Sequence, residues 1–184
     1  MKAALAVLGT AGFLILGCSM PLHHTHLDRM VRFKAQVAKE RIPLKVGVVP
    51  PSMPALPSDP ELWTWFFREA LGTVLKEVVV LKEVGEVRDV ALVVRPELWT
   101  YMGVGVGVNR GNCVIGFRFH VHDPRGVERL AFILEGRNRT ARAKVPFIGE
   151  GDYYNPFLAQ AMDELVEKLR KEFQDRRGVL VEIR

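Results

Sequence analysis

The chain has 184 residues, a length that suits one domain of ordinary size with additional segments. Its 26 basic and 21 acidic residues give a net charge of +5, which is too small an excess for a typical nucleic-acid-binding protein. That excess still permits contact with anionic lipid or another acidic surface. The two cysteines, Cys18 and Cys113, exclude a small scaffold held together by several disulfides, so stability has to come from an apolar core.

The first 17 residues have the pattern of a secretory signal peptide. Lys2 is followed by fifteen residues without a charge, Ala3 to Gly17, a run shorter than the ~20 residues that span a membrane. The run ends in Ile15-Leu16-Gly17-Cys18, which resembles the bacterial lipobox. That resemblance implies cleavage before Cys18 and acylation of its thiol and new amino group. An uncleaved anchor, or a plain signal peptide with a chance cysteine, is the alternative.

Residues 18–41 are expected to form a lipidated tether. Ser19 resembles the residue that sorts bacterial lipoproteins to the outer membrane. Residues 19–41 have five basic and two acidic side chains, a net charge of +3, and a possible helical stripe. The stretch is predicted to be either a basic helix on an anionic surface or a solvated helix or linker. His23, His24 and His26 are potential metal ligands without a fixed geometry, so we expect no metal site there.

Residues 42–184 are expected to form a single periplasmic domain. The patterns predict strands at 44–49, 78–81, 90–94, 114–122, 127–134 and 179–183, and the third strand either ends at 94 or continues to 108. Helices are predicted after Ser58-Asp59-Pro60-Glu61 and from Asn155-Pro156 to Gly178. This order predicts an α/β (α+β) fold, with a mostly antiparallel sheet of about 4–6 strands and two helices packed on one face.

Local signals add detail to these elements. Pro96 cannot donate a ladder hydrogen bond, so it predicts an edge or a bulge. Asp123-Pro124-Arg125-Gly126 suits a type I turn between two strands. The second helix places six apolar residues on one face, with the pairs Glu164–Lys168 and Glu167–Lys171 on the other: Leu158, Ala161, Met162, Leu165, Leu169 and Phe173.

Three segments of this domain resemble known envelope lipoproteins. They are LKVGVVP at 44–50, RDVALVV at 88–94 and FRFHVHDPRGV at 117–127. Together with the lipobox they resemble the lipopolysaccharide-assembly lipoprotein LptE, the curli secretion lipoprotein CsgG, the penicillin-binding-protein activator LpoB and the TolB N-terminal domain. The resemblance implies a binding role and no catalytic residues.

Two strand features suggest alternative functions. Gly103, Gly105 and Gly107 fall on one face of a strand, and such a hairpin could join an oligomeric pore. His120 and His122 share a strand face, a spacing that can ligate a metal, although no third ligand is evident. The alternative for the glycines is a flexible or partner-binding hairpin. The alternative for the histidines is a solvated or helix-covered strand face without a metal.

A basic loop is the main candidate binding site. Arg137, Arg139 and Arg142 cluster after the predicted hairpin, and Tyr153 and Tyr154 follow in a glycine-rich stretch. Arginine binds phosphate or carboxylate in bidentate fashion, so this edge is predicted to meet an anionic lipid or an acidic protein. A merely solubilising surface, with aromatic residues packed on the sheet, is the alternative.

The sequence as a whole predicts a lipoprotein on the periplasmic side of the outer membrane. We expect a non-catalytic binding or adaptor component in envelope assembly, transport or secretion, with no cofactor and no nucleic acid. Its partner is expected to be an envelope protein or anionic lipid. An oligomeric secretion-pore lipoprotein of the curli-channel type and a metal-dependent enzyme are the two alternatives.

Overall fold

The computed structural model describes residues 37–53, 60–85, 89–105, 111–139 and 156–183. They form five strands and three helices, whose bounds in chain order are β1 (Ile42–Val48), α2 (Pro60–Gly72), β2 (Leu75–Val80), β3 (Leu92–Gly105), β4 (Gly111–His122), β5 (Glu128–Arg137), α3 (Pro156–Asp175) and α4 (Arg177–Glu182).

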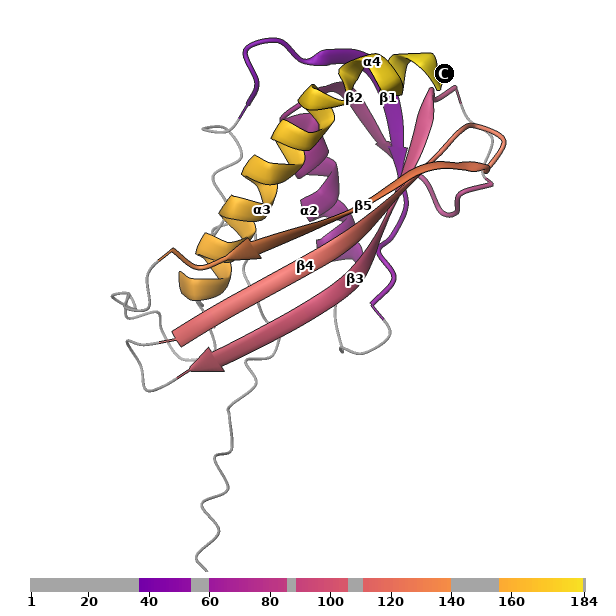
Figure 1. Ribbon diagram of the computed structural model, residues 1–184. Helices are drawn as coiled ribbons and strands as arrows, with labels where there is room; N and C mark the ends of the chain where they lie inside the picture. Colours follow the sequence, from indigo (N-terminus) through magenta and orange to yellow (C-terminus); the bar gives the residue numbers. More distant parts are fainter. Residues whose placement is uncertain (1–36, 54–59, 86–88, 106–110, 140–155, 184) are drawn as a thin grey trace, which may run out of the picture.

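The strands form one mixed sheet in the order β2-β1-β3-β4-β5 (Figure 1). β1 is parallel to both β2 and β3, whereas the β3–β4 and β4–β5 pairs are antiparallel. The antiparallel pairs are the longer ones, so the predicted mostly antiparallel α+β fold is confirmed. β2 and β5 are the two edge strands.

The main core lies between α2, α3 and one face of the sheet. Side chains alternate along β4, so Phe117 and Phe119 point to the helices while Arg118 and His120 point to the opposite face. Phe67 of α2 packs edge to face on Phe117, with ring centroids 4.8 Å apart. This packing holds both helices against the same face, as the sequence predicted.

A smaller apolar cluster covers part of the other face. Leu81, from the segment after β2, packs with Val49, Val90 and Val93. Gly47 makes this possible, because a Cβ there would lie 2.3 Å from the Leu81 side chain. The remaining part of that face belongs to β3, β4 and β5, and we call it the open face.

Several local predictions are confirmed. Pro96 lies in β3 beyond the last residue that pairs with β1, so the side of β3 away from β4 is a local edge there. Only Ser52 bridges this edge among the described residues, and its N–H donates to the Pro96 carbonyl over 3.0 Å. The missing Pro96 N–H therefore costs no bond to β4. The β4–β5 turn closes with Gly126 N–H donating to Asp123 C=O, and Gly126 has a φ of 82°, which favours glycine. The six stripe residues of α3 are all buried.

Two predictions are wrong. Residues 179–183 were expected as a strand after a helix stop at Gly178, but the chain continues into α4, with Leu180 N–H donating to Arg176 C=O. Leu180 is buried, so packing against the core overrides the β propensity of the flanking valines. The expected Glu167–Lys171 pair is replaced by Glu167–Arg139 and Lys171–Asp175, because tertiary contacts offer each side chain another partner.

Candidate interaction surfaces

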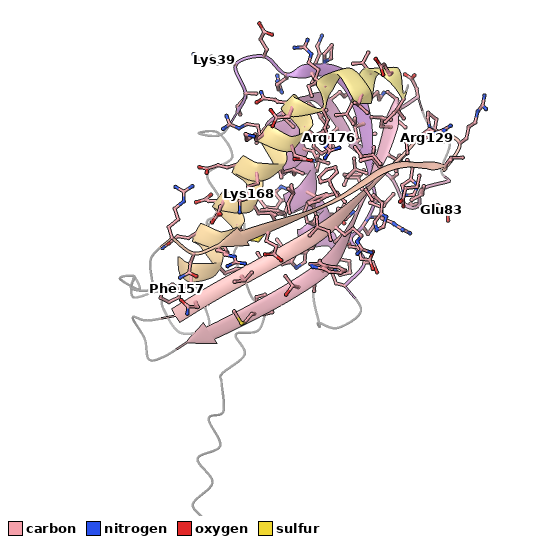
Figure 2. The ribbon with its side chains drawn as sticks, in the orientation of Figure 1. Lys39, Glu83, Arg129, Phe157, Lys168 and Arg176 are labelled. Carbon is pink, nitrogen blue, oxygen red and sulfur yellow. The ribbon has the colours of Figure 1, made fainter. Side chains whose placement is uncertain are left out.

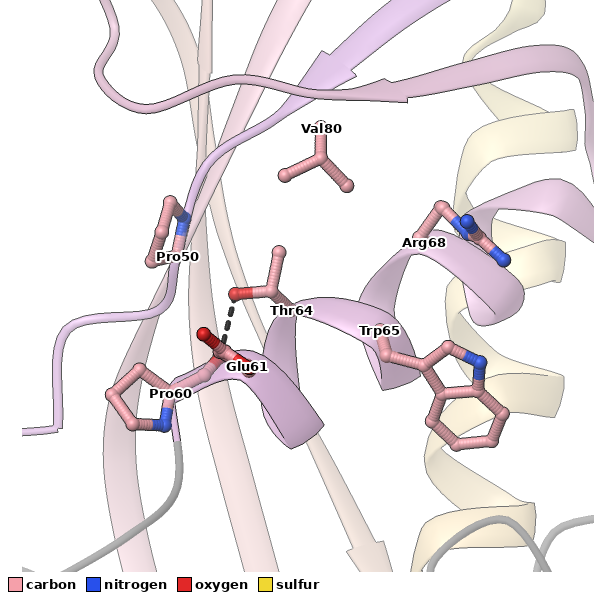
Figure 3. A pocket seen from close by; sticks show the side chains of 7 residues that line it. All are labelled: Pro50, Pro60, Glu61, Thr64, Trp65, Arg68 and Val80. Atoms are coloured by element: carbon pink, nitrogen blue, oxygen red, sulfur yellow. Dashed lines mark hydrogen bonds between the residues drawn. The ribbon is translucent and has the colours of Figure 1, made fainter.

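A cavity of about 260 Å³ lies between the start of α2 and the end of β2 (Figure 3). Trp65 and Arg68 of α2 line it on one side and Val80 of β2 on another. Thr64 also lines it, but its hydroxyl donates to the Pro60 carbonyl over 2.6 Å, which leaves the methyl group for contacts. The lining is therefore mainly apolar, with charged residues at the rim.

A second hollow of about 350 Å³ continues along the same strand. It is lined by Val37, Arg41, Arg68, Glu69, Gly72, Thr73 and Val78. Arg68 lines both hollows, and its guanidinium is held by Glu69 at 2.6 Å. We call the two hollows together the β2 groove.

The β2 groove runs beside unpaired backbone. Leu81 N–H donates to Val48 C=O, so the backbone groups of Leu81 point toward β1. These groups alternate in direction along a strand, and those of Val78 and Val80 therefore point away from β1. β2 has no strand neighbour on that side among the described residues. Val80 is also 52% exposed, so donors, acceptors and apolar surface coincide at this edge.

The open face has a charged cluster centred on His120. Its Nδ1 lies 2.7 Å from Glu128 Oε2 and its Nε2 lies 2.9 Å from Glu97 Oε2, so one ring links β3, β4 and β5. An ionised carboxylate only accepts hydrogen bonds. His120 can therefore donate to both carboxylates only when both of its ring nitrogens carry a proton. The hydrogen bond from His120 lowers the pKa of Glu128, against the opposing effect of burial. Next to it, the Arg118 guanidinium stacks on Trp99, with its Cζ 4.4 Å from the centroid of the Trp99 ring.

This cluster explains the histidine pair seen in the sequence. His120 is buried on the open face and held by two carboxylates, while His122 Nδ1 lies 3.3 Å from the Gly126 carbonyl. Within the described residues, no three His, Cys, Asp or Glu side chains are placed to hold a metal ion. The same residues also include no helix long and apolar enough to cross a membrane.

The predicted arginine site is described only in part. Arg137 is the last residue of β5 and Arg139 follows just after it, while Arg142, Tyr153, Tyr154 and Cys18 lie outside the described residues. Arg137 Nη2 is 3.2 Å from Glu135, and Arg139 Nη2 is 2.5 Å from Glu167 of α3. These carboxylates balance part of the positive charge, and the anionic partner of this edge stays a prediction.

Comparison with known proteins finds similar solved structures but no family. No family model and no curated protein matches the chain. Among solved structures, it is similar to the hypothetical protein CT253 from Chlamydia trachomatis, with 15% identity over 76% of this chain and 99% of that one and a TM-score of 0.49. The lipoprotein GNA1162 from Neisseria meningitidis has 12% identity, with 72% and 99% covered and a TM-score of 0.40.

A third similar structure is the PelC dodecamer from Paraburkholderia phytofirmans, with 17% identity over 72% of this chain and 89% of that chain and a TM-score of 0.44. The likeness thus includes bacterial lipoproteins at low identity. It concerns the general arrangement of sheet and helices, and its TM-scores are too low to transfer a function.

Proposed function

We propose that this chain is a lipid-anchored envelope protein whose domain binds an extended segment of a partner, in assembly, transport or secretion of an envelope component. The anchor is supported by Ile15-Leu16-Gly17-Cys18 at the end of an uncharged run. Its site is the outer membrane, on the periplasmic side, which Ser19 supports.

The observation that carries the binding role is the unpaired edge of β2 beside the β2 groove. An added strand would bond to the outward backbone groups of Val78 and Val80. Alternate side chains of that strand would face α2, where Trp65 and Val80 offer an apolar cavity. Main-chain bonds would then supply affinity, and the cavity would select an apolar side chain.

The anchor is tested by replacing the cysteines one at a time. Cys18→Ser should abolish acylation and either release the protein from membranes or leave it as an uncleaved precursor. Cys113→Ala is the matched control, because Cys113 is buried on β4 and burial raises the pKa of its thiol to about 12. Membrane fractionation and labelling with a palmitate analogue that leave Cys18→Ser indistinguishable from wild type would contradict the anchor.

The binding edge is tested by photo-crosslinking in intact cells. A benzophenone side chain at Val80 should give a discrete adduct, whereas one at Ile133, on the open face and 41% exposed, should not. Val80→Pro should remove the adduct when the label is at Lys76, because it deletes an outward N–H without breaking a bond to β1. Equal adducts at Val80 and Ile133, or binding unaffected by Val80→Pro, would contradict strand addition at β2.

A further inference from the structure

One end of the domain combines exposed valines with basic side chains. It consists of residues 37–41 and α4, which lie together at the top of the molecule in Figure 1. Arg177 Nη1 lies 3.6 Å from Glu40 Oε2, so the two segments are in contact. Leu180 is buried and fixes α4 on the core. We call this surface the α4 end.

The apolar side chains at the α4 end are turned outward. Val37 is 46% exposed, Val179 is 47% exposed and Val181 is 44% exposed. Val179 and Val181 flank the buried Leu180 on a helix of six residues, and the core does not use them. Single exposed apolar residues are ordinary, but three at one end beside cations are typical of a surface that meets a partner or a bilayer.

The charges at this end favour an anionic partner. The two segments have three cations, Lys39, Arg41 and Arg177, against the carboxylates of Glu40 and Glu182, a net charge of +1. Lys39 and Arg41 have no ion-pair partner within the described residues, whereas Arg177 is paired with Glu40. Figure 2 shows Lys39 on this side of the molecule.

The tether reaches the domain at this same end. Residues 18–36 separate Cys18 from Val37, and nineteen extended residues reach at most about 65 Å. Such a length does not by itself orient the domain, so any fixed orientation has to come from the domain surface. We propose that the α4 end docks on anionic phospholipid, with its cations at the phosphates and Val37, Val179 and Val181 at the headgroup boundary. This docking rests on the proposed lipid anchor.

The test uses the acylated full-length protein in vesicles of phosphatidylcholine with or without phosphatidylglycerol. An environment-sensitive fluorophore is attached at Val181→Cys, and at Ile133→Cys on the open face as the control. Cys113 is buried and does not compete for the label. The emission at position 181 should shift to the blue in vesicles that contain phosphatidylglycerol, and the emission at position 133 should stay constant.

The cations are tested in the same system. Lys39→Gln with Arg41→Gln should reduce the shift at position 181 at least about threefold while the acyl chains keep the protein on the vesicles. Attached protein without a shift, or with the same shift at both labels or in both vesicle types, would overturn docking. A shift that follows protein density instead of phosphatidylglycerol would mean that a second copy covers this end, and would also overturn it. Protein that fails to float with the vesicles would contradict the anchor itself.

Discussion

The outer backbone groups of the two edge strands differ in their hydrogen-bond partners. At β5, side chains of α3 bond to the strand's outer backbone: Arg137 N–H donates to Glu164 over 3.1 Å, and Lys168 Nζ donates to Glu135 C=O over 2.7 Å. Arg139 N–H then donates to Gln160 over 3.0 Å. At β2, the outward groups of Val78 and Val80 have no strand beside them among the described residues.

This difference supports the proposal that a partner strand binds at β2. An edge strand with unpaired backbone templates further pairing, and most proteins block it with charges, prolines or a covering helix. The end of β5 is blocked by α3, whereas β2 presents Val78 and Val80 next to two hollows. The contrast also predicts that substitutions at the β5 edge cost stability, while those at the β2 edge cost binding.

The largest expected effect comes from the helix that closes β5. Leu165 is buried on the core face of α3, and Leu165→Ala should lower the free energy of unfolding by about 2–5 kcal/mol. Glu167→Ala, which removes an exposed pair with Arg139 on the same helix, should cost well under 1 kcal/mol. Chemical denaturation measures both variants, and equal losses would contradict the assigned facing of α3.

A pair of glycines compares the two edges directly. A Cβ at Gly136 of β5 would lie 1.8 Å from the Ala161 carbonyl oxygen, so Gly136→Ala should cost about 1–3 kcal/mol as α3 is forced outward. A Cβ at Gly72, at the end of α2 beside the β2 groove, meets nothing within 4 Å. Gly72→Ala should therefore stabilise the protein by about 0.5–1 kcal/mol in the same melts. If Gly136→Ala were more stable than Gly72→Ala, α3 would not close the β5 edge.

The smallest expected effect is a change in pH dependence at the start of β5. The pKa of Glu128 is lower in the folded protein than in the unfolded chain, chiefly because His120 donates to it. Its contribution to stability is complete above the unfolded pKa of about 4.3 and is lost as the pH falls through the lower folded pKa. Glu128→Gln should thus flatten the decline of the melting temperature between about pH 5 and pH 3.

Glu77→Gln is the control at the other edge. Glu77 of β2 pairs with Lys45 at 3.1 Å, and both side chains are partly exposed. An exposed pair contributes little, so this variant should keep the wild-type slope. Identical slopes for Glu128→Gln and wild type would show that the hydrogen bond between Glu128 and His120 does not contribute to stability.

Much of the fold could be predicted because its signals are local. The start of α2 at Pro60, the apolar stripe of α3 and the turn at Asp123–Gly126 each depend on a few neighbouring residues, and each lies where it was expected. The residues after Gly178 show the limit of such signals. Their valines favour a strand, but burial of Leu180 against the core, a contact distant in sequence, makes them helical.

The candidate surfaces were harder to predict for the same reason. The β2 groove joins Trp65 and Arg68 of α2 to Val80, and only the parallel β1–β2 pairing places β2 at the edge. The sole sequence signal was a short run of valines, which fits a central strand equally well. His120 was singled out as a histidine, but Glu97 lies 23 residues away and becomes its partner only through the β3–β4 register.

The burial of Cys113 has a consequence for how motion in the sheet can be followed. Its thiol lies on the core side of β4, and its pKa of about 12 keeps the reactive thiolate scarce at neutral pH. The thiol is thus shielded from oxidants for as long as this part of the core stays closed. Any opening of the core on this side of β4 exposes it, so the rate of thiol modification in native buffer reports how often that part of the core opens.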